Sequence, residues 1–213
     1  MTHDTATVPL HAHVVLDRSA SMRSCAAEAV AGYNAYVATL PPWARVSLTL
    51  FDSHGIDLMR DAVEPADAPL GDGEYEPRGM TPLYDAIGQA IAAAERRPAG
   101  FDRVALVIIT DGMENASREC SREDVLRRLD EKQEGEGWLV IYLGANQDAW
   151  QVGQQFGTVA GNSMSIDTDR LEDVMTSAGR ATSDYVRSVD PQVGRMMSSF
   201  SDVERVRARR RPG

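Results

Sequence analysis

The sequence has 213 residues, of which 43% are hydrophobic and 25% are charged, as in globular proteins with an ordinary core. Its formal net charge of −10 argues against general nucleic-acid binding, and its longest apolar runs are far shorter than the roughly 18 residues that span a membrane. Two cysteines and the lack of a recognisable signal peptide predict a cytoplasmic protein with free thiols.

The first part of the chain alternates predicted strands and helices. Residues 11–17 form an apolar run that predicts a strand, and residues 24–40 carry apolar side chains at helical spacing. Residues 45–51 alternate apolar and polar side chains with period two and predict a second strand. Residues 56–63 follow closely enough to pair with it as a hairpin.

The second part continues this alternation after a loop at 64–80 that is rich in Pro, Gly, Asp and Glu. A helix is predicted to open at Thr81, and the β-branched run 104–110 predicts a strand covered on both faces. The later predicted elements are a helix from Ser121 to Glu134, a strand at 138–143, a helix at 147–156, a strand region at 159–166 and a helix at 168–189. This order predicts a doubly wound α/β fold with a mostly parallel sheet and helices on both faces.

We expect one domain with short tails. The predicted domain covers residues 10–190, after an N-terminal tail at 1–9. Residues 191–213 form an Arg-rich C-terminal tail that we expect to be flexible or helical, solvated or in contact with an acidic surface. The three tryptophans are expected in the core: Trp43, Trp138 and Trp150.

Oxygen-bearing side chains gather where predicted strands end and a helix begins. Asp17, Ser19 and Ser21 follow the first strand with the spacing Asp-x-Ser-x-Ser, Thr81 opens a helix, and Asp111 follows the strand 104–110. Each alone has an ordinary explanation as a helix cap or a turn residue. Together, at the carboxyl edge of a parallel sheet, they offer the oxygen ligands that hard divalent cations prefer.

These residues resemble the von Willebrand factor type A family, whose metal-ion-dependent adhesion site reads Asp-x-Ser-x-Ser, then Thr, then Asp. All five positions match, and the resemblance covers roughly residues 10–190, with compact stand-alone bacterial and phage members the most similar. It implies a Rossmann-like sheet of six strands with one antiparallel edge strand. It also implies Mg²⁺ or Mn²⁺ held by the five residues Asp17, Ser19, Ser21, Thr81 and Asp111.

The resemblance further implies a protein–protein interaction module, in which the ion binds an Asp or Glu side chain of a partner protein. Family analogy adds AAA+ ATPases, kinases and phosphatases as candidate partners, with no nucleic acid and no membrane involved. The alternative is a metal-dependent hydrolase or phosphotransferase that uses the same site. The chain has no Gly-rich phosphate loop and no Gly-x-Ser-x-Gly elbow, and Lys132 is its only lysine, so we expect no catalytic residues and no enzyme.

Other polar residues near these segments are expected to have structural roles. Asp52 is expected to begin a turn, with a hydrogen bond to the metal's ligands as the alternative. His11 and His13 alternate on one strand without Cys or acidic companions, so sheet-surface or partly buried histidines are expected rather than zinc ligands. A solvated loop is expected at the acidic segment 72–76, with a guard of the site or an internal carboxylate ligand as the alternative. A solvated loop is also expected at Glu114 and Asn115, with contact to a partner as the alternative.

Overall fold

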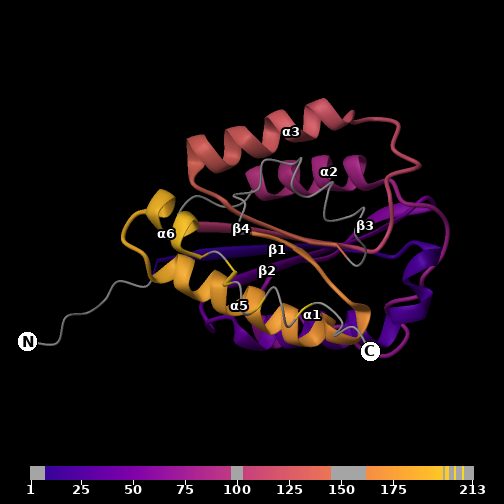
Figure 1. Ribbon diagram of the computed structural model, residues 1–213, viewed down its shortest axis with the longest axis horizontal. Coiled ribbons are helices and arrows are strands. Elements are labelled where there is room, and N and C mark those ends of the chain that lie inside the picture. Colours follow the sequence, from indigo (N-terminus) through magenta and orange to yellow (C-terminus); the bar gives the residue numbers. More distant parts are fainter. Residues whose placement is uncertain are drawn as a thin grey trace, which may run out of the picture.

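A six-stranded sheet runs through the middle of the protein in the order β3-β2-β1-β4-β5-β6. The computed structural model describes residues 8–96, 103–144, 162–198, 200, 201, 204 and 208. Helices α2 and α3 cover one face of the sheet, α1 and α5 cover the other, and α6 lies at one end of the sheet next to α5 (Figure 1). The doubly wound α/β class expected from the sequence is confirmed.

Strand pairing places the ends of β1 and β4 side by side. The strands are β1 (Leu10–Asp17), β2 (Arg45–Asp52), β3 (Gly55–Val63), β4 (Arg103–Thr110), β5 (Leu139–Gly144) and β6 (Ser163–Ser165). All pair in parallel except β3, which runs antiparallel to β2 at the edge, as expected. The strand order reverses between β1 and β4, and such a switch point opens a crevice at the carboxyl ends of the strands.

The helices begin and end close to the predicted positions. The α-helices are α1 (Ala26–Thr39), α2 (Leu83–Glu95), α3 (Arg122–Asp130), α5 (Leu171–Arg187) and α6 (Pro191–Met197). Short 3₁₀ turns occupy Ala20–Cys25, Pro65–Asp67 and Thr168–Arg170, and a π turn at Glu131–Gly135 extends α3. The capping box that opens α3 at Ser121 is present. The helix predicted at 147–156 lies outside the described residues, as does the start of the strand region predicted from 159.

Successive residues of β1 face opposite helical layers, because side chains alternate along a strand. Leu10, Ala12, Val14 and Leu16 join the core beneath α1 and α5, whereas Val15 joins the core beneath α2 and α3. The histidines share the α2 face. His11 bonds Ser47 Oγ at 2.9 Å and His13 bonds Thr49 Oγ1 at 2.8 Å. Both are more deeply buried than expected, since hydroxyls on β2 satisfy part of their polarity.

Helices α1 and α5 pack closely because each has a glycine at the contact with the other. A Cβ on Gly179 of α5 would lie 1.8 Å from Thr39 Oγ1, and a Cβ on Gly32 of α1 would lie 3.1 Å from Met175 Cγ. The buried Tyr36 hydroxyl also bonds Thr182 Oγ1 across this interface at 3.2 Å. These contacts hold α5 in one position along α1.

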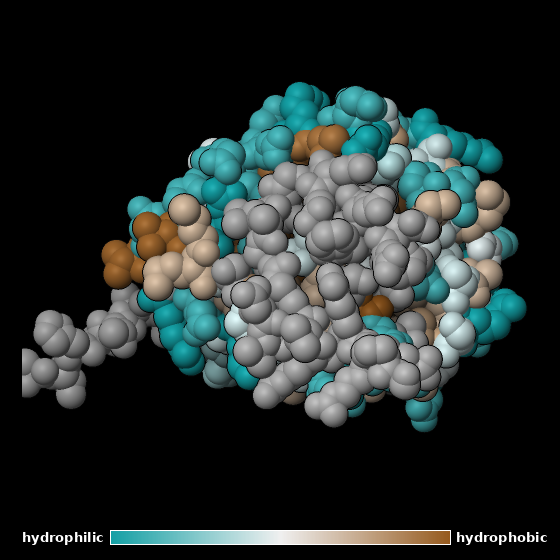
Figure 2. Space-filling view, in the orientation of Figure 1, coloured by the Kyte–Doolittle hydropathy of each residue, from teal (hydrophilic) through white to brown (hydrophobic). Residues whose placement is uncertain are grey.

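The core extends past residue 190, where the sequence placed the end of the domain. Phe200 and Ala208 are buried against the α1 and α5 layer, and Asp167 N donates a hydrogen bond to Ala208 O. Helix α6, capped by Asp190, leaves hydrophobic side chains exposed, visible at the left of Figure 2. Parts of the predicted tail therefore belong to the domain.

Of the three tryptophans, the structure describes two. Trp138 is buried, as predicted, but Trp43 is 43% exposed in the turn before β2, so its expected core position is wrong. Trp150 lies outside the described residues. None of the helices in the described part of the chain has the length and apolar character that crossing a bilayer requires.

Candidate metal site

Asp17 is the fully buried anchor of the site. It ends β1 on the α2 face, and its two carboxylate oxygens have different donors. Ser19 N donates to Oδ1 at 2.7 Å, and the Thr110 hydroxyl at the end of β4 donates to Oδ2 at 2.5 Å. The Tyr75 hydroxyl donates to the backbone carbonyl of Asp17. Ser19 and Thr110 therefore fix the carboxylate, and Tyr75 in the loop before α2 fixes the backbone of the same residue.

Three of the predicted ligands form a hydrogen-bonded chain beside it. Ser21 Oγ donates to Asp111 Oδ1 at 2.7 Å, and Ser19 Oγ lies 3.0 Å from Ser21 Oγ. A hydroxyl carries one proton, so Ser19 is the donor to Ser21. Ser19 is buried, Asp111 is half-buried and Ser21 is exposed, so the chain leads from the interior to the surface.

Thr81 reaches the same place from the loop before α2. A Cβ on Gly112 would lie 3.0 Å from Thr81 Oγ1 and 3.4 Å from Ser21 Oγ, so both hydroxyls approach the small space beside this glycine. Within the described residues Thr81 Oγ1 makes no hydrogen bond, although Thr81 is 3% exposed. Asn115 makes two hydrogen bonds to the Thr81 backbone: its side-chain Oδ1 accepts from Thr81 N, and its backbone N–H donates to Thr81 O.

The two carboxylates of the site lie where charge is costly. Burial raises the pKa of Asp17 to about 6, against the opposing hydrogen bonds from Thr110 and Ser19, and the charge of Asp111 raises it further. Burial also raises the pKa of Asp111. Among the described residues no ion pair reaches Asp17, so a cation placed between these oxygens would stabilise both charges.

The donor set suits a hard cation. In the described part of the chain, no three His, Cys, Asp or Glu side chains are arranged to hold a metal ion, so a metal here would depend on hydroxyls. Serine and threonine hydroxyls with two carboxylates, all oxygen, are the ligand chemistry of Mg²⁺ and Mn²⁺ rather than of zinc. The residues present therefore fit the ion that the sequence predicts.

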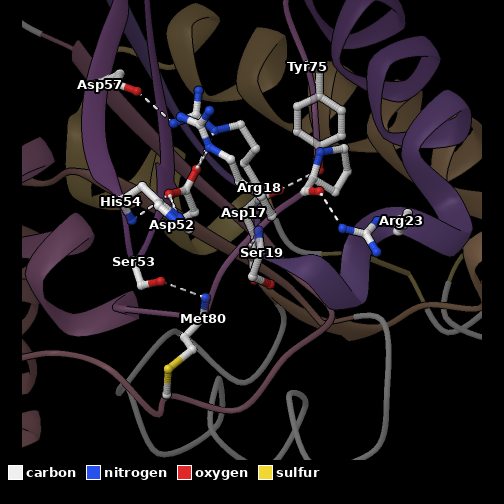
Figure 3. Close-up of polar contacts among 12 residues, drawn as sticks. Asp17, Arg18, Ser19, Arg23, Asp52, Ser53, His54, Asp57, Tyr75 and Met80 are labelled. Atoms are coloured by element: carbon white, nitrogen blue, oxygen red, sulfur yellow. Dashed lines mark hydrogen bonds and ion pairs between the residues drawn. The ribbon is translucent and has the colours of Figure 1, made fainter.

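An ion-pair cluster around the buried Arg18 and Asp52 supports the loop after β1. Arg18 Nε donates to Asp52 Oδ2 at 2.7 Å and its Nη2 to Asp57 Oδ2 at 2.6 Å, while Arg78 Nε donates to the same Asp52 oxygen (Figure 3). Asp52 Oδ1 accepts from His54 N, which is the turn that the sequence predicts. Although burial opposes it, the His54 N–H and the two arginines hold the pKa of Asp52 below its usual range.

This cluster leaves Asp52 engaged with arginines rather than with the predicted ligands. Arg18 lies next to Asp17 in sequence, but its guanidinium is directed to the β2–β3 hairpin. The Arg18 guanidinium thus neutralises Asp52 and does not neutralise Asp17, whose charge remains available to a metal ion bound beside Ser19 and Ser21. Figure 3 shows this separation, with Asp52 and Asp57 on one side of Arg18 and Ser19 on the other.

Two loops expected to be solvated expose Asp72, Glu76 and Asn115, but one acid in each loop is held by hydrogen bonds. Glu74, in the acidic segment 72–76, accepts two hydrogen bonds from Arg60 and one from Gly71 N. Glu114 accepts from the N–H groups of Ala116 and Ser117 and from the Ser117 hydroxyl. Neither acid lies free beside the site, because local backbone donors hold both in place.

Sequence reasoning does not identify three residues that orient the predicted ligands. Thr110 and Tyr75 orient Asp17, and Asn115 orients Thr81. Thr110 could have been identified, because it ends a strand beside Asp17 and alternation places it on the same face. Tyr75 and Asn115 act across loops whose path no periodicity specifies.

Comparison with known proteins assigns the fold. No family model and no curated protein sequence matches this chain. Among solved structures, von Willebrand factor type A from Catenulispora acidiphila superimposes with a TM-score of 0.64 at 17% identity, covering 84% of this chain and 44% of that one. The fold is therefore that of von Willebrand factor type A domains.

Two further structures show how widely this fold is used. The vWF domain of the type V pili tip protein Mfa5 from Porphyromonas gingivalis gives a TM-score of 0.66 at 11% identity, covering 86% of this chain and 98% of that one. The ArnB paralog VWA2 from Sulfolobus acidocaldarius gives 0.56 at 18% identity, covering 79% and 44%. This chain spans less than half of the Catenulispora and Sulfolobus chains. At these identities the likeness shows the fold alone.

Proposed function

We propose that this protein is a metal-dependent protein-binding module whose ion takes up an Asp or Glu side chain of a partner. The observation that carries the proposal is the meeting of Ser19, Ser21, Thr81 and Asp111 around one space next to the buried Asp17. These residues come from three segments of the chain and supply only oxygen donors.

Charge determines what such a site can do. Ser19, Ser21 and Thr81 would bind Mg²⁺ or Mn²⁺ directly, and Asp17 and Asp111 would hold it through water. Neutral hydroxyl ligands leave the ion most of its positive charge, so a carboxylate from outside gains a strong electrostatic attraction. Desolvation of both groups offsets part of that gain. When bound, the ion supplies a Lewis-acidic position for an external oxygen.

The surface around the site supports a protein partner. Met80 and Met113 are 50% and 60% exposed, and they directly adjoin Thr81 and Gly112. Exposed methionines adapt to different apolar surfaces and are common where proteins bind several partners. A carboxylate at the metal, with aliphatic side chains on these two methionines, would give a small interface with an apolar margin.

The alternative function is a metal-dependent hydrolase or phosphotransferase. Arg18, the basic residue next to Asp17, is paired with Asp52 and Asp57 and does not point at the candidate metal site. Phosphoryl transfer needs cations directed at the transferred group. Phosphatase and nucleotide-hydrolysis assays with Mg²⁺ and Mn²⁺ test this alternative, and any turnover that Asp17→Ala abolishes would favour it.

The binding function is tested by affinity capture from cell extract, with Mg²⁺ or with excess EDTA. We expect wild-type protein to retain a specific partner with Mg²⁺ but not with EDTA. The double variant Ser19→Ala/Ser21→Ala should retain it under neither condition. Ser24→Ala is the matched control, because Ser24 is exposed in the same segment and its hydroxyl is directed to Ser21 O. Equal capture in Mg²⁺ and EDTA would refute the proposal.

A further inference from the structure

A groove of about 520 Å³ begins beside the metal site and leads away from it. Met80, Pro82 and Asn115, which surround Thr81, line its near end. One wall is the β2–β3 turn from Asp52 to Ile56, and the other is the start of α2 with the loop 115–118. Ser53 Oγ accepts from Met80 N at 2.9 Å, which joins the hairpin wall to the segment that carries Thr81 (Figure 3).

The two acids that line the groove are already satisfied. Asp85 is 6% exposed, and its oxygens accept from Arg118 N, Glu119 N and Cys120 N. Asp52 is buried and accepts from Arg18, Arg78 and His54, as described above. Their charge is therefore matched by fixed donors, and they offer no free acceptor to a ligand.

The donors that line the groove remain available. Within the described part of the chain, the Gln89 amide and the Arg118 guanidinium make no hydrogen bond, and both residues are exposed. Asn115 uses its Oδ1 for Thr81 N, which leaves its NH₂ group for a ligand. The groove is thus rich in unused donors and has its own acceptors occupied.

We propose that this groove binds the chain of the partner that continues from the metal-bound carboxylate, as an extended acidic segment whose second carboxylate pairs with Arg118. The inference rests on the proposed function. Backbone carbonyls of an extended segment suit the amides of Gln89 and Asn115, and a carboxylate suits a guanidinium fork. The volume of the groove is in the range of ordinary ligand sites.

Defined peptides and Mg²⁺ test the inference. One peptide carries a single Asp in a Gly-Ser background, and a series adds a Glu after Gly-Ser spacers of increasing length. Affinities are measured by NMR on isotopically labelled protein. We expect one spacer length to bind up to about fivefold more tightly than the single-Asp peptide, the gain typical of one exposed charge pair. Backbone signals of Gln89 and His54 should shift with it.

Arg118→Gln should remove this gain while leaving the single-Asp peptide unaffected. Arg127→Gln is the control, because Arg127 is an exposed arginine on α3 paired with Glu131, outside the groove lining. If Mg²⁺ and the single-Asp peptide bind but no added Glu strengthens binding, or if Arg118→Gln retains the gain, the groove proposal is wrong and the metal-dependent function stands. If Mg²⁺ or the single-Asp peptide fails to bind, both proposals are wrong.

Discussion

Ser21 Oγ donates a 2.7 Å hydrogen bond to Asp111 Oδ1, which joins two residues 90 positions apart in the chain. Ser21 follows β1 and Asp111 follows β4, the strands on either side of the switch point. The bond shows that the doubly wound topology assembles the candidate site, since neither loop alone contains enough oxygens. Changes at this junction should affect metal binding more than folding.

Gly112→Ala should weaken metal binding while the protein stays folded. The added Cβ would lie 3.0 Å from Thr81 Oγ1 and 3.4 Å from Ser21 Oγ, in the space where the hydroxyls meet. We expect Mn²⁺ affinity to fall about tenfold, the order of effect seen when ligand positioning is disturbed. Calorimetric titration measures it. Gly135→Ala is the control, because a Cβ there has no atom within 4 Å, and equal affinities in both variants would contradict the geometry.

Asp52→Asn should destabilise the protein, since it removes the buried one of the two carboxylates that pair with the Arg18 guanidinium. Breaking one partner of a buried pair costs about 3 kcal/mol. Urea denaturation measures the free energy of unfolding. Asp57→Asn removes the exposed partner of the same arginine, with a side chain 48% exposed, and should cost less than about 1 kcal/mol. A larger loss at Asp57 than at Asp52 would show that this ranking is wrong.

Gly179→Ala should destabilise the packing of α5 on α1. Its Cβ would lie 1.8 Å from Thr39 Oγ1 and 2.8 Å from Thr39 Cβ, so the Thr39 side chain must move or the helices must separate. Overpacking of this kind costs about 1–3 kcal/mol. Thr39→Ala removes that oxygen and should restore part of the loss in the double variant, as measured by denaturation. Purely additive effects would indicate that the two side chains do not meet.

Acid should destabilise the protein through His13. Burial, with a smaller effect of the neighbouring His11, lowers the pKa of His13 to about 3. The unfolded chain takes up this proton near pH 6.5 and the folded protein does not, so stability falls as the pH drops from about 6.5 towards 3. At pH 5 the cost is about 2 kcal/mol.

His13→Asn isolates this contribution, because it cannot take up the proton. The loss of unfolding free energy between pH 7 and pH 5 should be about 2 kcal/mol smaller in the variant than in the wild type. Comparing the pH dependence of the unfolding free energy in the two proteins cancels the contributions of the other titrating groups, because both proteins contain them. Identical slopes would mean that His13 is protonated equally in the folded and unfolded states.

Much of the fold could be predicted from periodicity and resemblance. The period-two pattern of β2 and the continuous apolar run of β4 locate both strands to within a residue or two. The alternation in β2 does not reflect solvent exposure, because the polar Ser47 and Thr49 are buried and bonded to His11 and His13. Helix α6 is anticipated only as the helical alternative for the tail 191–213 and without bounds, because it is short and its stability comes from the Asp190 cap and contacts with α5. Trp43 was assigned to the core from its chemistry alone, and the turn that carries it leaves it half exposed.

The candidate site could be predicted as a set of oxygen-bearing residues but not as a geometry. Asp17, Ser19, Ser21, Thr81 and Asp111 were chosen from spacing and resemblance, and the structure brings the oxygens that it describes close together. The roles of Tyr75, Asn115 and Arg18 depend on which loops meet, and local sequence does not encode this. The hydrogen bonds of Glu74 and Glu114 could not be predicted, because a sequence does not show which backbone N–H groups lie within reach of a carboxylate.

The most direct test of the central claim is a Mn²⁺ titration followed by electron paramagnetic resonance, in which bound manganese loses the signal of the free ion. Wild-type protein should bind one ion, with an affinity that falls at least about tenfold in Thr81→Ala and in Asp111→Ala. Adding acetate should change the relaxation of the bound ion, because an external carboxylate reaches it. A free-ion signal that wild-type protein leaves unchanged, or binding that both substitutions leave intact, would contradict the account.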